Sequence, residues 1–174
     1  MSLLKEKLTK VLPGQIAEIS SFVKENGDKV VSQVTIAQVY GGMRGVKGLV
    51  CDTSEVPPDK GLIIRGIELK DLVDKTPEEI LWLLLTSELP TAEELADLQK
   101  ELESRQEVPQ YVWDVIDAMP ADSHPMAMFN TAVLVMQRES VFAKRYTEGM
   151  KKAEYWEATL EDSLNIIAKL PAIG

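Results

Sequence analysis

The sequence is poor in the residues that build disulfides, metal clusters and most acid–base sites. Its 174 residues include one cysteine, Cys51, and one histidine, His124. A single cysteine excludes an internal disulfide, so we predict a reducing compartment and a cytoplasmic location. One cysteine and one histidine are too few for a zinc cluster, and we predict no metal site.

Positive charge and long apolar runs are also scarce. Nineteen Lys and Arg residues stand against 28 Asp and Glu residues, which gives a net charge of −9. General binding to nucleic acid or to anionic membranes needs a net basic surface, so we predict neither kind of partner. The longest apolar runs, 81–85 and 132–136, are far too short to span a bilayer. The first residues, MSLLKEKLTK, lack the apolar centre of a secretory signal.

Apolar residues recur mostly at helical spacing, which predicts a mainly α fold with one small β-hairpin. The hairpin is expected over 49–66, around two prolines and a glycine. Residues 30–40 fit either a strand or a short helix that starts near Thr35. Helices are expected over 3–12 and 15–25, interrupted by Pro13-Gly14, and then within 76–90, 92–105, 110–119, 125–136 and 147–169.

Paired carboxylates along the chain are explained by helix ends rather than by catalysis. TPEE at 76–79 and TAEE at 91–94 each form a capping box, in which a threonine and a glutamate satisfy free backbone N–H groups. Glu161/Asp162 lies on an amphipathic helix. We predict no catalytic dyad among these pairs, and Cys51 is expected to pack in an apolar strand.

Two basic segments are candidates for binding a phosphorylated ligand. The first is GGMRGVKG at 41–48, where clustered glycines expose backbone N–H groups beside Arg44 and Lys47. The second is AKRYTEGMKK at 143–152, where Lys151 and Lys152 are expected in the first turn of the last helix, against the helix dipole. From the residues alone, a solvated surface is the favoured explanation of both segments.

His124 is predicted to be structural. It precedes Pro125, and a residue before proline is disfavoured in the α conformation, so His124 suits the N-cap of the next helix. That helix, MAMFNTAVLVM at 126–136, is apolar around its whole circumference. Such a helix lies in the centre of a core or at a subunit interface.

These motifs together resemble the N-terminal part of citrate synthase, in particular the branch that includes mitochondrial enzymes. The resemblance covers nearly the whole chain in order, apart from a shorter stretch around 70–77. The segments that carry it are VYGGMRGVKGLV (39–50), DTS (52–54), GLIIRGIEL (61–69), LWLLLTSELPT (81–91), MPADSHPM (119–126), FAKRYTEG (142–149) and YWEATLEDSLNIIAKLP (155–171).

The resemblance implies that residues 1–174 form the N-terminal segment of the large domain of an α-helical homodimer. The family condenses acetyl-CoA with oxaloacetate and water to give citrate and CoA, with acetyl-CoA as substrate and no permanently bound cofactor. Arg44 and Lys152 match two family positions that reach the CoA phosphates. At the second position the family has an arginine, where this chain has Lys152. The helices over 109–140 match part of the dimer interface.

The family's catalytic residues and its small domain are expected beyond residue 174. We therefore predict no catalytic residue within this chain and no activity for the chain alone. Two alternatives stay open: a segment of 2-methylcitrate synthase, which uses propionyl-CoA, and a non-catalytic helical dimerisation module.

Overall fold

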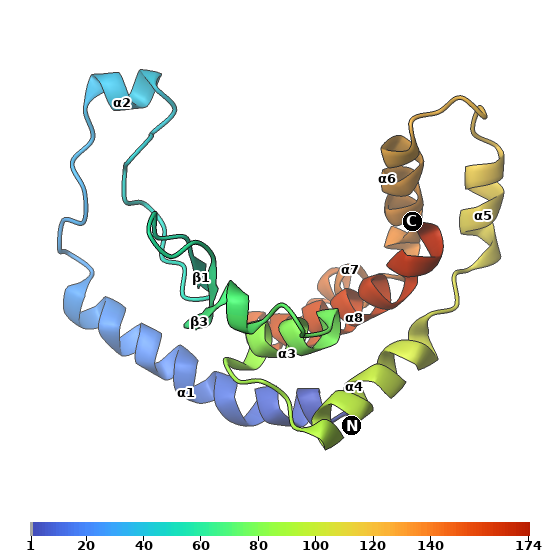
Figure 1. The fold of residues 1–174 in the computed structure, drawn as a ribbon, viewed down its shortest axis with the longest axis horizontal. Coiled ribbons are helices and arrows are strands. Elements are labelled where there is room, and N and C mark those ends of the chain that lie inside the picture. Colours follow the sequence, from blue (N-terminus) through green and yellow to red (C-terminus); the bar gives the residue numbers. More distant parts are fainter. Residues whose placement is uncertain (1) are drawn as a thin grey trace. The chain divides into compact units, whose positions relative to one another are not determined.

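The chain folds into two compact, mainly helical units, over residues 3–95 and 96–174. The computed structural model describes residues 2–174. Short β-strands occur only in the first unit among these residues, so the predicted mainly α fold is confirmed. Figure 1 shows the order of the elements along the chain.

The first unit is built around one long helix and a short apolar one. Its core consists of Leu4 and Leu8 from α1 together with Trp82 and Leu83 from α3, all buried. Lys7 lies over the Trp82 ring and binds Glu88 and Glu94 across the unit. The elements are α1 (Leu3–Asn26), α2 (Ile36–Tyr40), β1 (Ser54–Glu55), β2 (Ile63–Ile64), β3 (Ile67–Glu68), η1 (Leu69–Asp71), α3 (Pro77–Thr86) and the beginning of α4 (Ala92–Arg105).

α1 runs without interruption through Pro13, so the predicted break at Pro13-Gly14 is wrong. The φ angle of proline is already helical, and its cost is one lost backbone hydrogen bond and a steric conflict with the preceding turn. Here the carbonyl that loses its donor belongs to Thr9, which is exposed, so water can take the place of the missing N–H.

The predicted hairpin is present and continues into a third strand. β1, β2 and β3 form one antiparallel sheet in that order. Arg65 and Gly66 connect β2 to β3 with φ angles of 47° and 81°. Positive φ at both central residues is the signature of the type I′ turn, whose twist matches that of paired strands.

Capping residues fix the helix starts of the first unit where the sequence predicts them. The threonine N-cap at 35 also resolves the ambiguous segment 30–40 in favour of the short helix α2. The bonds from the threonine N–H groups lower the pKa values of Glu79 and Glu94, because they stabilise the charged carboxylates. The capping pairs are Thr35 with Gln38, Thr76 with Glu79, and Thr91 with Glu94.

The second unit contains two pairs of packed helices. α5 packs against α6 and η2 through Val112, Ala132 and Met136. Figure 1 shows α5 and α6 running side by side in opposite directions. α7 packs along α8. The elements are the rest of α4, then α5 (Gln110–Asp117), α6 (Pro125–Val135), η2 (Met136–Glu139), α7 (Val141–Thr147), η3 (Lys152–Glu154) and α8 (Tyr155–Ile173).

Arg105 ties the end of α4 to α8. Its guanidinium binds Glu101 at 2.7 Å and Glu161 at 2.9 Å, and it donates to Asn165 Oδ1 at 2.8 Å. The backbone carbonyl of Arg105 also accepts from Lys169 at 2.8 Å. Only the pair with Glu101 is local, four residues away on the same helix, whereas the partners on α8 lie more than fifty residues away and cannot be predicted from the sequence around Arg105. Within residues 2–174, no helix has the length and apolarity needed to cross a membrane.

Candidate functional site

The glycine segment 41–48 folds as a tight turn directly after α2. Gly42, Met43 and Gly45 all have positive φ, at 77°, 62° and 75°. Two hydrogen bonds hold the turn: Met43 N–H donates to the Gln38 carbonyl at 2.7 Å, and Val46 N–H donates to the Met43 carbonyl at 3.1 Å. Glycine suits the left-handed positions because it has no Cβ to clash with its own backbone.

Arg44 stands exposed at the tip of this turn. Within residues 2–174 its guanidinium makes no ion pair or hydrogen bond, and the backbone N–H groups of Gly42, Arg44 and Gly45 also have no partner. Successive N–H groups in such a turn form a concave site for anions, and a planar guanidinium binds phosphate through two parallel hydrogen bonds. An exposed guanidinium beside N–H groups without a partner is suitable chemistry for a phosphate, and the contact of Arg44 with a phosphate stays a prediction.

The basic segment 143–152 has a different structure from the predicted one. α7 ends at Thr147, and Gly149, with φ of 89°, turns the chain into the three-residue helix η3. Lys152 lies in η3, and α8 begins only at Tyr155, so the prediction that Lys152 lies in the first turn of the last α-helix is wrong. The reason is the glycine, which ends α7 before the apolar spacing of α8 begins.

The basic side chains of this segment differ in whether they are paired with carboxylates. Arg145 is bound by two carboxylates, Glu154 and Glu157, each at 3.5 Å. Lys144, Lys151 and Lys152 are exposed, and among the described residues none of the three lysines forms an ion pair. These lysines are the free cations of the segment. Lys152 belongs to the second unit and Arg44 to the first.

Asp162 anchors the segment by capping α7 from α8. One carboxylate accepts from Ser140 Oγ at 2.6 Å, from Val141 N–H at 2.7 Å and from Phe142 N–H at 3.1 Å. The last two donors are free N–H groups at the start of a helix, which a carboxylate satisfies well. Sequence reasoning missed this role, although Ser140 before an amphipathic run is itself a recognisable N-cap.

A second contact between α7 and α8 is aromatic. Phe142 and Tyr155 meet edge to face with ring centroids 5.1 Å apart, and Tyr146 stacks on Phe142 at 5.9 Å. Together with the Asp162 cap, this cluster holds α7 against α8. The residues that follow Thr147 therefore start from a helix that is held in place.

His124 occupies the predicted N-cap. Its Nδ1 accepts from Met126 N–H at 3.1 Å, with Pro125 in the first helical turn. The histidine is exposed and no carboxylate or nucleophile is bonded to it among the described residues, so the structure gives it a capping role.

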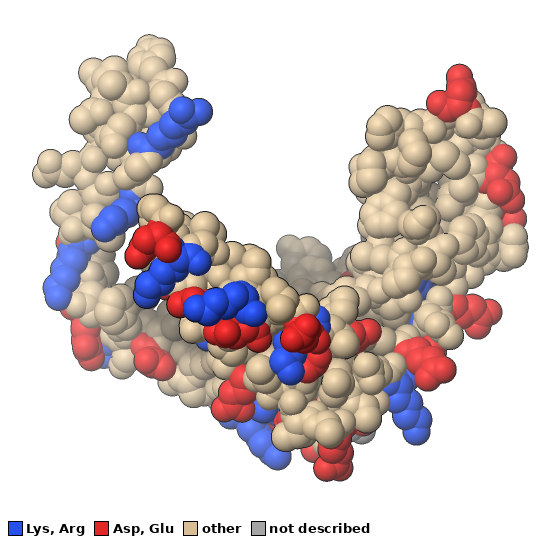
Figure 2. Space-filling view, viewed as in Figure 1, with Lys and Arg blue, Asp and Glu red and all other residues tan. Residues whose placement is uncertain are grey.

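The helix that His124 opens is not buried within this chain. Only Ala132 of α6 is fully buried, whereas Met126 is 56% exposed and Leu134 is 74% exposed. α6 contains no charged residue, and the surface that it presents in Figure 2 is uncharged. The sequence predicts that this helix lies either in the centre of a core or at a subunit interface. Its exposure excludes the core of this chain, and the subunit interface stays a prediction.

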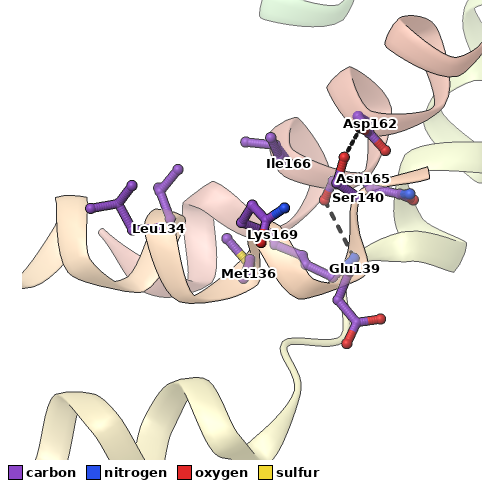
Figure 3. A pocket seen from close by; sticks show the side chains of 10 residues that line it. Leu134, Met136, Glu139, Ser140, Asp162, Asn165, Ile166 and Lys169 are labelled. Carbon is purple, nitrogen blue, oxygen red and sulfur yellow. Dashed lines mark hydrogen bonds between the residues drawn. The ribbon is translucent and has the colours of Figure 1, made fainter. Parts of the chain in front are cut away.

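A pocket of about 220 Å³ lies between the end of α6 and α8. Figure 3 shows Leu134, Met136 and Ile166 on its apolar wall. Its polar groups already serve the fold: Ser140 donates to Asp162 along the dashed line that joins these two residues in Figure 3. Lys169 donates to the Arg105 carbonyl. Burial, followed by the nearby charge of Arg105, lowers the pKa of Lys169. The pocket has apolar packing surface and no arrangement of nucleophile and base.

Each pair of carboxylates has at least one member with a structural partner. Glu79 and Glu94 cap helices, Glu161 binds Arg105, and Asp162 caps α7. Across residues 2–174, no group of three His, Cys, Asp or Glu side chains is arranged to hold a metal ion.

Cys51 is exposed, so the prediction that it packs in an apolar strand is wrong. The strand begins only at Ser54, and the residues before it form a loop in which Thr53 Oγ1 lies 3.3 Å from the sulfur. The Thr53 side chain and then the backbone of Ser54 hydrogen-bond the sulfur and lower its pKa to about 7. A polar loop at the surface thus gives a partly ionised thiol at neutral pH.

We expect alkylation of Cys51 by iodoacetamide to become roughly tenfold faster between pH 6 and pH 8, because the thiolate is the reactive form. The midpoint should lie at about pH 7, below the ordinary thiol value of 9.0. Thr53→Val should move the midpoint upward, and Thr9→Val, which alters an exposed threonine of α1, should leave it unchanged. A midpoint near 9 in the parent protein would contradict the prediction.

Comparison with known proteins identifies the family. The family model for "Citrate synthase, C-terminal domain" matches residues 42–174. Mitochondrial citrate synthase of Saccharomyces cerevisiae is 41% identical over 98% of this chain, and so is mitochondrial 2-methylcitrate synthase of Yarrowia lipolytica. The chain spans only 38% and 39% of the length of these two relatives.

Solved structures share the fold. Citrate synthase of Pyrobaculum aerophilum superposes with a TM-score of 0.67 at 23% identity, covering 83% of this chain and 38% of that one. Citrate synthase of Thermoplasma acidophilum, in a ternary complex with carboxymethyl coenzyme A and oxaloacetate, gives 0.62 at 20% identity, covering 82% and 35%.

The relatives also correct the predicted location. Those from several fungi that match 98% of this chain are named as mitochondrial enzymes, so the cytoplasmic prediction is wrong. A single cysteine indicates only that no internal disulfide is needed, and this holds in any compartment that keeps thiols reduced. From its ordered motifs, its helical fold and its match over residues 42–174, we conclude that this chain belongs to the citrate synthase family.

Proposed function

We propose that residues 1–174 are the N-terminal large-domain segment of a citrate synthase, and that the small domain lies outside this chain. The complete enzyme condenses acetyl-CoA with oxaloacetate and water, releasing citrate and CoA. Acetyl-CoA is a substrate in this scheme, and no permanently bound cofactor takes part. The observation that carries the proposal is the match of residues 42–174 to the family, together with the 41% identity to a citrate synthase.

Within this segment, Arg44 and Lys152 contact the phosphates of CoA. Two features of the described residues support this assignment: both side chains are exposed, and neither has a carboxylate partner. A guanidinium at 44 can bind a phosphate with two bonds, whereas the ammonium of Lys152 acts as a point charge. Lys152 is therefore expected to contribute less than Arg44.

The chain forms a homodimer through the helices over 109–140. The exposed apolar surface of α6, with Met126 and Leu134, supports this proposal, because a helix without charges gains stability when another apolar surface covers it. No catalytic residue is assigned within residues 1–174.

2-Methylcitrate synthase is the second candidate. The relative of that name from Yarrowia lipolytica has the same 41% identity as the yeast citrate synthase, so overall similarity does not separate the two activities. The difference lies in the acyl group, acetyl against propionyl, and a direct comparison of the two substrates decides between them.

Thiol release is the measurement that tests the function. We expect the complete protein to release CoA from acetyl-CoA and oxaloacetate, with a smaller kcat/KM for propionyl-CoA, and residues 1–174 alone to release none. In the complete protein, Arg44→Ala should raise the KM for acetyl-CoA about tenfold with little change in kcat, because one charge-assisted phosphate contact is lost.

Lys60→Ala is the control, since it removes an exposed cation of the same unit that lies outside the glycine segment, and it should leave this KM unchanged. A preference for propionyl-CoA would favour the second candidate. Release of CoA by residues 1–174 would refute the absence of catalytic residues, and an unchanged KM in Arg44→Ala would refute the phosphate contact.

A further inference from the structure

Arg145 sits between two carboxylates beside the segment that carries Lys152. Its NH2 lies 3.5 Å from Glu154 Oε2, and its NH1 lies 3.5 Å from Glu157 Oε2. We propose that Arg145 is a positioning residue for phosphate recognition: it neutralises these two carboxylates and holds them away from Lys152. The inference rests on the proposed role of Lys152 at the CoA phosphates.

The charge of the segment depends on Arg145. Residues 144–157 carry four basic and three acidic side chains, a net charge of +1, and the loss of Arg145 would bring this to zero. Glu154 is two residues from Lys152, and its side chain is 47% exposed. Without Arg145, the Glu154 carboxylate is free to bind Lys152 and to repel a phosphate at the same place.

The backbone of Arg145 fixes the same segment. The Arg145 carbonyl accepts from Met150 N–H at 3.0 Å, and Glu154 N–H donates to the Lys151 carbonyl at 2.9 Å. The side chain thus joins the end of η3 and the start of α8 to α7, while the main chain closes the turn at Gly149. Lys152 lies between these two fixed points.

A purely stabilising role explains less of this arrangement. The Asp162 cap and the Phe142 aromatic cluster already hold α7 against α8. The Arg145 side chain is 33% exposed and its partners are at 3.5 Å, and ion pairs of this kind contribute little to folding. Removing the guanidinium should therefore leave the fold intact and change mainly the local charge.

The test uses the complete protein and compares KM for acetyl-CoA among variants. Arg145→Gln should raise this KM about three- to tenfold, with kcat and the KM for oxaloacetate unchanged. The triple variant Arg145→Gln/Glu154→Gln/Glu157→Gln should return KM to within about twofold of the parent, because the carboxylates are removed together with their partner. About 0.5 M salt should reduce the effect of Arg145→Gln, since exposed charges are then screened. Binding of adenosine 3′,5′-bisphosphate should follow the same order.

Two further variants make each outcome decisive. Lys100→Gln removes an exposed cation from α4 and should leave KM unchanged. Lys152→Gln tests the underlying function: if it leaves the KM for acetyl-CoA unchanged, the role of Lys152 fails and the inference fails with it. If Lys152→Gln raises KM but Arg145→Gln does not, or if the triple variant fails to recover, only the role of Arg145 is overturned.

Discussion

Leu134→Glu is expected to dissociate the proposed homodimer and raise its dissociation constant at least about a hundredfold, because the carboxylate would have to be buried without a partner. Leu134 lies on α6, where its side chain is 74% exposed in the single chain and no charged residue is present between Pro125 and Val135. A glutamate costs the fold of residues 1–174 little at such an exposed position, so within this segment the change acts on association rather than on folding. Light scattering coupled to gel filtration of the complete protein measures the outcome.

Val73→Glu provides the control. Val73 is 70% exposed and lies outside residues 109–140, so the same apolar-to-acidic change should leave the protein dimeric. A Leu134→Glu variant with the mass of a dimer at micromolar concentration would contradict the assignment of this helix to the interface.

Asp162→Ala is expected to lower the free energy of unfolding by about 3 kcal/mol, because it leaves three donors at the start of α7 without their acceptor. Two of them are backbone N–H groups that no other residue of the helix can bind. The loss should lower the melting temperature of the complete protein and loosen α7 first. Calorimetry measures the melting temperature, and hydrogen exchange at Val141 and Phe142 measures the loosening of α7.

Asp162→Asn should lose part of this stability, since an amide keeps one acceptor oxygen and replaces the other with a donor. Asp114→Ala is the matched control: Asp114 accepts only from exposed Gln110 on the same helix, and its loss should cost about 0.5 kcal/mol or less. A change below about 1 kcal/mol in Asp162→Ala would show that α7 does not depend on this cap.

The sequence by itself determined the features that depend on neighbouring residues. The threonine caps before α2, α3 and α4, and the His124-Pro125 start of α6, follow from hydrogen bonds that reach only two or three residues along the chain. The ordered motifs also indicated the family, and the glycine segment at 41–48 together with the resemblance indicated Arg44 as a phosphate candidate. Over most of the chain, helices lie where the apolar spacing predicts them, because this spacing shows which face of a helix must be buried.

Only the tertiary structure decided which side chains meet across long stretches of sequence. Asp162 lies 21 residues from Val141, where the helix that it caps begins, and Glu161 lies 56 residues from Arg105. The turn at Gly149 separates Lys152 from the last α-helix, and it is the fold of α7 against α8 that gives Arg145 its two carboxylates. The exposure of Cys51 and of α6 is likewise decided by which surfaces this chain can cover. Local spacing specifies a residue's conformation and face, whereas its partners depend on distant segments that only folding brings together.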